Sequence, residues 1–131
     1  MRKLFKQSKN ILGVLTRGTD YIARKPKQHP IPPNVSILIN DVKEMDNKYK
    51  YDYIFFSTED EFIRINFTKH FKYKLKQVKP NVNVKYNLYL INIIILSKCL
   101  DIITAKCSGT AGIFVLSNGF RNIKIYELGY Y

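Results

Sequence analysis

The sequence has only two cysteines and two histidines among its 131 residues. Cys99 and Cys107 have no zinc-like spacing and no paired histidines beside them, so we expect plain buried thiols in a reducing compartment. A chain of this length buries roughly two-thirds of the surface that its unfolded form would expose. We therefore expect residues 1–131 to form a single domain that needs neither a disulfide nor a structural metal.

A long apolar run is also missing. The longest, Leu88 to Leu96, is interrupted by Asn92 and is far shorter than the ~20 residues that a membrane span requires. The basic N-terminal segment leads into Ile11 to Leu15, which is too short for the core of a signal peptide, and no small-residue cleavage site follows. These absences predict a cytoplasmic protein without a transmembrane segment.

Acidic residues are scarce, with 10 against 22 basic ones, which gives a formal net charge of +12. Clustered Lys and Arg would indicate nucleic-acid binding, because they neutralise phosphates. The 17 lysines are instead spread along the whole chain, and only Lys69 to Lys79 approaches a patch. Solvated lysines on most faces are one explanation, and an anionic ligand or acceptor is the other. A small basic nucleic-acid-binding domain without enzymatic activity is the alternative function.

Short apolar runs alternate along the chain with segments of helical periodicity. Runs rich in β-formers or continuously apolar predict buried strands, and apolar residues three and four apart predict helices. Prolines forbid a helix across residues 24–33. The expected strands cover residues 11–15, 53–57, 73–78, 102–105 and 123–126. Helices are expected from a cap at Asn34 or Ser36 to about residue 48, from residue 59, over 84–99, and after the small residues 108–112 up to Asn118-Gly119.

The second of these helices carries a capping signature. Thr58 and Glu61 have the T-x-x-E spacing in which a hydroxyl and a carboxylate satisfy free backbone donors reciprocally, so the helix should begin at Glu59. Its buried side should be formed by four apolar positions, Phe62, Ile63, Ile65 (or Asn66) and Phe67.

Five strands alternating with four helical segments predict an α/β fold, a doubly wound parallel sheet with helices on both faces. The usual strand order of such a Rossmann-like sheet, 3-2-1-4-5, places a ligand crevice between the first and fourth strands. The loops that follow strands one, two and four would open onto it.

The loop after the first strand begins with Arg17, whose forked guanidinium suits two parallel hydrogen bonds to phosphate. Gly18 lets the backbone come close, and Thr19 has a short polar side chain. The small residues after strand four precede a helix whose N-terminus favours an anion. We therefore assign the phosphates of a nucleotide diphosphate to Arg17, Gly18 and Thr19 together with Ser108, Gly109 and Thr110.

The loop after the second strand carries Glu59 and Asp60, and either carboxylate can accept both N1–H and N2–H of a guanine. Simpler interpretations stay open at each stretch. The acidic residues 59–61 can favour the helix dipole alone, and the small residues 108–112 can serve close packing alone. Arg17 can pair with Asp20 or Asp101. His29 and His70 are expected to be a loop residue and a surface cap.

Three stretches together resemble the donor-binding domain of bacterial fucosyltransferase-like glycosyltransferases, relatives of the α-1,6-fucosyltransferases and the nodulation fucosyltransferases. They span about 100 residues of the chain. The stretches are G-V-L-T-R-G-T-D-Y at 13–21 with H-P-I at 29–31, Y-I-F-F-S-T-E-D-E at 53–61, and L-S-K-C with S-G-T-A-G between 96 and 112.

This resemblance implies the C-terminal half of a GT-B type architecture, which binds a GDP-sugar, usually GDP-fucose, without a metal cofactor and serves a glycan acceptor. By motif match, Arg17 takes the place of the phosphate-binding arginine, Glu59 that of the guanine-reading acid, and Ser108 that of a phosphate-contacting serine. DNA or RNA is not an expected partner.

Two departures from the family pattern matter. The α-1,6 enzymes have two adjacent arginines where this chain has Arg17-Gly18, and the carboxylate expected a few residues later is replaced by basic residues. The catalytic base is therefore unassigned. The first strand begins near residue 11, so we expect the N-terminal acceptor domain to be absent or supplied by a separate chain.

Overall fold

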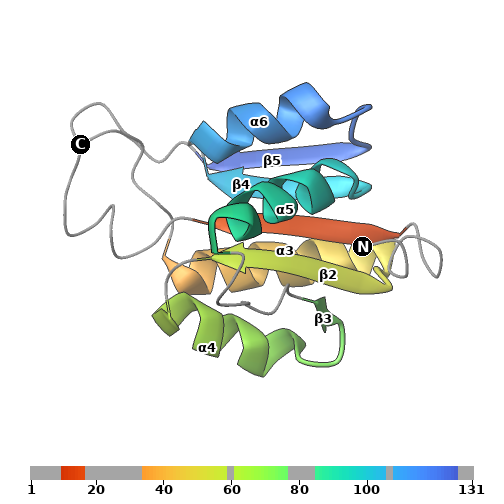
Figure 1. Cartoon of the computed structure of the whole chain (residues 1–131). Helices are drawn as coiled ribbons and strands as arrows, with labels where there is room; N and C mark the ends of the chain where they lie inside the picture. Colours follow the sequence, from red (N-terminus) through yellow and green to blue (C-terminus); the bar gives the residue numbers. More distant parts are fainter. Residues whose placement is uncertain (1–9, 17–33, 59–60, 77–84, 106–107, 127–131) are drawn as a thin grey trace.

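The computed structural model describes residues 10–16, 34–58, 61–76, 85–105 and 108–126. Along the chain the elements are β1 (Ile11–Thr16), α3 (Val35–Tyr49), β2 (Tyr53–Thr58), α4 (Glu61–Phe71), β3 (Leu75–Lys76), α5 (Lys85–Ser97), β4 (Asp101–Ala105), α6 (Ser108–Leu116) and β5 (Asn122–Tyr126). All strand pairs are parallel, and the order in the sheet is β3-β2-β1-β4-β5. The predicted fold class and strand order are therefore confirmed (Figure 1).

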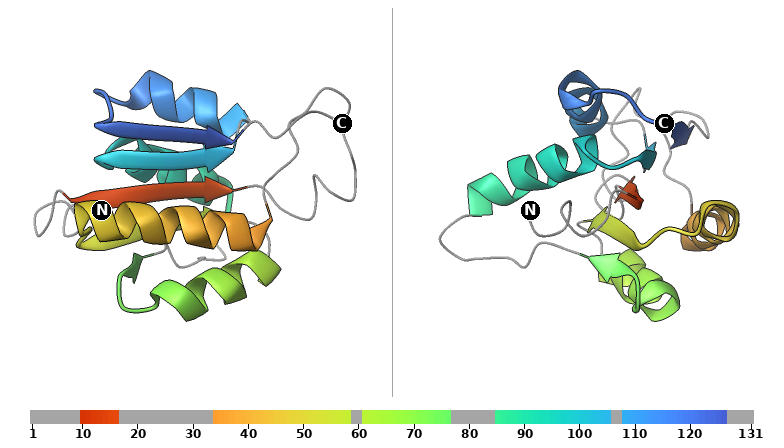
Figure 2. Two further views of the ribbon diagram at one scale, coloured as in Figure 1. Left: turned by 180° about the vertical axis from the view of Figure 1, so that it is seen from behind. Right: turned by 90° about the vertical axis from the view of Figure 1, so that its right-hand side faces the viewer.

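Helices cover both faces of this sheet. Figure 2 shows α3 and α4 on one face and α5 and α6 on the other. Since side chains alternate along a strand, β1 contributes to two separate cores. Leu12 and Val14 face α3 and α4, while Ile11 and Leu15 face α5 and α6. The continuous apolar run of β1 is thus explained by burial on both faces.

Helix α3 begins as predicted, at a cap provided by Asn34. The Asn34 side chain accepts a hydrogen bond from the backbone N–H of Ile37, with an N···O distance of 2.9 Å. Leu38, Ile39 and Val42 are buried and form the apolar face of this helix.

Helix α4 differs from the prediction in its buried face. Ile63, Phe67 and Phe71, spaced four residues apart, are buried, whereas Phe62 and Ile65 are 66% and 63% exposed. The Phe67 ring stacks on Phe56 of β2 with 4.1 Å between centroids, and this contact selects the face. The described helix begins at Glu61, and the predicted start at Glu59 lies outside the described residues.

Two further segments differ in part from the expected ones. Of the edge strand expected over residues 73–78, Leu75–Lys76 is a strand, residues 73–74 are not, and residues 77–78 lie outside the described residues. The small residues from Ser108 to Gly112 are not a turn before a helix; they form the first turns of α6 itself. Helix α5 is less completely enclosed than its apolar sequence indicates, because Leu90 is 53% exposed while Ile93, Ile95 and Leu96 are buried.

A buried carboxylate joins β4 to its neighbours at the amino-terminal edge of the sheet. The Asp101 side chain is fully buried and receives two hydrogen bonds from Arg121, with N···O distances of 3.1 and 2.7 Å. It also accepts hydrogen bonds from the Asn122 backbone N–H at 2.9 Å and from the Tyr51 hydroxyl. Burial, followed by the hydrogen bond to Asp101, raises the pKa of Tyr51 above its ordinary value.

Candidate functional site

The carboxyl ends of β1, β2 and β4 lie side by side at one edge of the sheet. Thr16, the last residue of β1, is in register with Thr58, the last residue of β2. Leu15 of β1 is in register with Thr104 of β4 on its other side. The strand order reverses between β1 and β4, and the crevice at such a point is where doubly wound sheets bind ligands.

The predicted phosphate and guanine residues adjoin this edge. Arg17, Gly18 and Thr19 directly follow β1, and Glu59 and Asp60 connect β2 to α4. These five residues lie outside the described residues, so their contacts with a nucleotide stay predictions. The fold establishes that β1 and β2, the strands that precede them, end next to each other.

The start of α6 is fastened to the end of β4 by two threonines. Thr110 is buried, and its hydroxyl donates to the carbonyl oxygen of Ala105 at 2.7 Å. Its oxygen also lies 3.0 Å from the hydroxyl oxygen of Thr104. Ser108 and Gly109 are the first two residues of the described helix, and backbone N–H groups in the first turn of a helix have no intrahelical partner. The geometry gives Thr110 a positioning role, and its own contact with a phosphate stays a prediction.

Two other residues at this edge, Thr16 and Arg64, were not predicted as site residues from the sequence. Thr16 is buried, and within the described part of the chain its hydroxyl oxygen has no hydrogen-bond partner. Arg64 donates from Nη2 to the carbonyl oxygen of Thr58 at 3.0 Å, which adds a guanidinium to the carboxyl end of β2. A basic residue near the start of a helix interacts unfavourably with the helix dipole. This unusual position is the sequence signal by which Arg64 could have been identified.

Asp101, one alternative partner of Arg17, already has other partners. Asp101 is in register with Leu12, at the opposite edge of the sheet from the end of β1. Its carboxylate is already occupied by Arg121, Tyr51 and Asn122. Arg17 itself lies outside the described residues, so its pairing with Asp101 stays an untested alternative.

Close helix packing is a weak explanation for the glycine at position 112 of α6. A Cβ atom at this position would lie 3.4 Å from Cγ2 of Ile93, which is an ordinary contact. Close packing of α5 and α6 therefore does not require glycine there. His70 is exposed in the last turn of α4, in agreement with its predicted surface role, and His29 lies outside the described residues.

Neither a metal site nor a membrane-spanning helix is found among the described residues. Among the described residues, no three His, Cys, Asp or Glu side chains come together as a metal site. Cys99 is buried, its thiol contacts the carbonyl oxygen of Ile95 at 3.4 Å, and burial raises its pKa, so it is a structural thiol as predicted. Cys107 lies outside the described residues. No helix in the described ranges is long and apolar enough to span a membrane.

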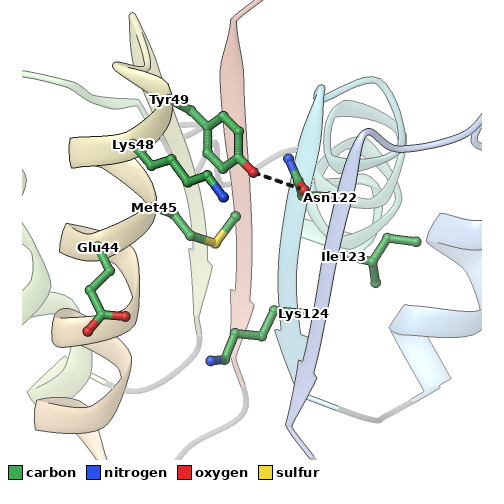
Figure 3. A pocket seen from close by; sticks show the side chains of 7 residues that line it. All are labelled: Glu44, Met45, Lys48, Tyr49, Asn122, Ile123 and Lys124. Carbon is green, nitrogen blue, oxygen red and sulfur yellow. Dashed lines mark hydrogen bonds between the residues drawn. The ribbon is translucent and has the colours of Figure 1, made fainter.

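A groove of about 290 Å³ lies elsewhere, between α3 and β5. Figure 3 shows the side chains of Lys48 and Lys124 reaching into it from opposite walls. The Tyr49 hydroxyl donates to Asn122 Oδ1 at 3.1 Å across one end. Tyr49 ends α3 and Asn122 begins β5, so this end of the groove is at the amino-terminal edge of the sheet, away from the predicted crevice.

Comparisons with known proteins find a likeness in structure only. No family model matches the sequence, and no curated protein matches it. The fold is similar to that of POFUT1 in complex with GDP-fucose, with a TM-score of 0.68 and 10% identity over 98% of this chain and 45% of that chain. POFUT1 in complex with GDP matches with a TM-score of 0.67 at 10% identity, over 97% of this chain and 46% of that one. The chain thus has a fold similar to that of part of POFUT1 and spans less than half the length of the structures it matches.

Proposed function

We propose that this chain is the donor-binding domain of a glycosyltransferase that transfers fucose from GDP-fucose to a glycan hydroxyl with inversion. One observation carries the proposal. Nearly the whole chain has the fold of part of POFUT1, which has been solved with GDP-fucose and with GDP. The three stretches assigned to a nucleotide from sequence adjoin the strand ends where such a sheet binds ligands.

The proposed chemistry relies on fixed positive charge at the departing diphosphate. Arg17 and the backbone N–H groups at the start of α6 would stabilise the negative charge that develops as the bond between sugar and phosphate breaks. The Thr110 to Ala105 hydrogen bond would hold that helix start in place beforehand. Glu59 or Asp60 would read guanine, no metal would be needed, and the general base is unassigned.

Nucleotide preference tests this proposal directly. We expect calorimetry to show tighter binding of GDP than of ADP or UDP, because only guanine presents the N1–H and N2–H donor pair to one carboxylate. Glu59→Gln should reduce the preference, since an amide cannot accept both donors. Glu44→Gln, a change on the exposed side of α3, is the matched control and should leave it unaltered. Equal affinities for the three nucleotides would remove the guanine assignment.

A nucleic-acid-binding domain is the second candidate, and one surface segment favours it. Tyr73 is 90% exposed, and the Lys72 ammonium lies 5.0 Å from the centre of its ring. Basic and aromatic side chains together suit single-stranded nucleic acids. Nearby, Lys74 is already paired with Asp46 at 2.9 Å. A rise in melting temperature with an oligonucleotide and none with GDP would favour this function over the transferase.

A further inference from the structure

Strand β5 forms an open edge of the sheet. All five of its residues are in register with β4, and within the described part of the chain no strand lies on its other side. Half of the backbone N–H and C=O groups of such a strand point away from the sheet and can pair with another strand. The opposite edge is different, because β3 has only two residues and lysines at positions 72, 74 and 76 surround it.

The side chains along β5 divide between two faces. Tyr49 and Asp41 of α3 contact Asn122, Lys124 and Tyr126 on one face. Ile123 and Ile125 therefore point to the other face, where they are 53% and 40% exposed. Helix α6, which covers this face, adds two exposed apolar side chains, Val115 at 82% and Leu116 at 50%. An edge strand with exposed isoleucines is a site for pairing with another strand.

We propose that β5 pairs antiparallel with β5 of a second copy of this chain, across a two-fold axis at Lys124. This inference does not depend on the proposed function. The sequence of β5 is self-complementary in this arrangement, which indicates a second copy as the partner. In this register Ile123 faces Ile125 of the second copy, twice by symmetry, and Asn122 faces Tyr126. All five residues of β5 are paired, and the two sheets become one, with the apolar positions together on one face.

The symmetric register places Lys124 opposite its own copy, and the structure limits this repulsion. The Lys124 ammonium lies 3.3 Å from a carboxylate oxygen of Asp41. Figure 3 shows its side chain extending over the groove toward α3, away from the open edge. The net charge of +12 on each copy still opposes association at long range. We therefore expect the dimer to be stronger at 0.5 M than at 0.05 M salt, because salt screens that repulsion.

Sedimentation equilibrium of the whole chain tests the dimer. We expect a monomer–dimer equilibrium with a dissociation constant on the order of 10–100 µM, typical of a small interface. Ile125→Lys should weaken it at least tenfold, because the charge would be buried against an isoleucine. Ile65→Lys, at an exposed position of α4, is the matched control and should behave as wild type. A wild-type chain that stays monomeric at 300 µM, or a dimer that Ile125→Lys leaves intact, would overturn the proposal.

Cysteine cross-linking tests the register and does not depend on Ile125→Lys folding. In a Cys107→Ser background, Lys124→Cys should form a disulfide-linked dimer under mild oxidation, since directly opposed residues of antiparallel strands have Cα atoms about 4.5–5.5 Å apart. Ile123→Cys faces position 125 and should cross-link at least tenfold more slowly. Cys99 is buried and should not react. Faster cross-linking at 123 than at 124, or none at either position, would overturn the register and with it the proposal.

Discussion

Asp101 is a fully buried carboxylate whose charge is retained by its neighbours. Burial acts to raise its pKa, but the hydrogen bonds from Arg121, Tyr51 and Asn122 outweigh burial and hold the pKa below its usual value. A carboxyl group with a lower pKa in the folded than in the unfolded state stabilises the fold above its unfolded pKa, near pH 4. That contribution disappears as the pH falls through the folded pKa.

We therefore predict that Asp101→Asn lowers the free energy of unfolding by roughly 2–3 kcal/mol at pH 7. This lies below the usual cost of breaking a buried pair, because Arg121 is 40% exposed and can recover hydration. The difference between variant and wild type should shrink in urea denaturation at pH 2–3. Glu44→Gln serves as the exposed control. An undiminished difference at low pH would show that the cost comes from packing and not from the charge.

Arg17 is expected to be a ligand residue with little structural role. We predict that Arg17→Ala leaves the melting temperature of the free protein nearly unchanged and weakens GDP binding by about 30- to 1000-fold. The estimate is the loss of a charge-assisted, forked contact worth roughly 2–4 kcal/mol. Isothermal calorimetry with GDP measures the effect.

Two controls sharpen this prediction. Arg17→Lys should recover only part of the affinity, because an ammonium keeps the charge but not the fork. Guanosine has no phosphate, so it should bind wild type and Arg17→Ala alike. The prediction is contradicted if Arg17→Ala unfolds the protein or changes the GDP affinity by less than about twofold.

At the scale of elements, Gly13 determines how closely α5 approaches β1. A Cβ atom on Gly13 would lie 2.9 Å from Cδ1 of Ile102, 3.0 Å from Cδ2 of Leu96 and 3.1 Å from Sγ of Cys99. We predict that Gly13→Ala costs about 1 kcal/mol and Gly13→Val about 3 kcal/mol, because the neighbouring side chains must move in a packed core. Urea midpoints measure both.

Gly112→Ala is the contrasting substitution for Gly13→Ala. A methyl group at residue 112 makes only an ordinary contact, and alanine is a better helix former than glycine by about 1 kcal/mol. We therefore expect this variant to be as stable as wild type or more stable. If Gly13→Ala and Gly112→Ala change the free energy of unfolding equally, the space around each glycine does not determine the cost of the substitution.

The strands and their order could be predicted because buried strands leave a local signal. The run Ile11 to Leu15 is continuously apolar, the run Tyr53 to Ser57 is rich in β-formers, and both are followed by polar residues, which is enough to place β1 and β2. The buried face of α4 could not be predicted. Phe62, Ile63, Ile65 and Phe67 are consistent with more than one helical face, and the stacking of Phe67 on Phe56, a contact between elements, decides between them.

The sequence predicts at which edge of the sheet the candidate site lies, but not the contacts within it. Strand ends and a helix start are readable from apolar runs and small residues, so the ends of the strands that precede Arg17, Glu59 and Ser108 were correctly predicted to lie at one edge of the sheet. The contacts that organise this edge join different elements. The bond from Thr110 to Ala105 and the bond from Arg64 to Thr58 depend on how each helix packs, and no spacing in the sequence encodes them.

At the scale of the whole molecule, the extent of the structural match bears on turnover. The chain corresponds to 45% of the POFUT1 chain whose structure contains GDP-fucose. Catalysis of sugar transfer requires the acceptor to be held against the donor in a near-attack geometry. Such positioning can lower the barrier by about 7–11 kcal/mol. A domain that binds the donor alone supplies only part of that arrangement.

We therefore predict that these 131 residues bind GDP-fucose but transfer fucose to glycans at a rate near that of the uncatalysed background. Donor binding by calorimetry and transfer of labelled fucose should be measured on the same preparation, so that inactive protein is distinguished from incomplete protein. GDP release without transfer would still agree with the prediction, because it reports hydrolysis of the bound donor. Robust transfer by the purified chain would contradict it, since the acceptor would then be held by residues that we assign to donor binding alone.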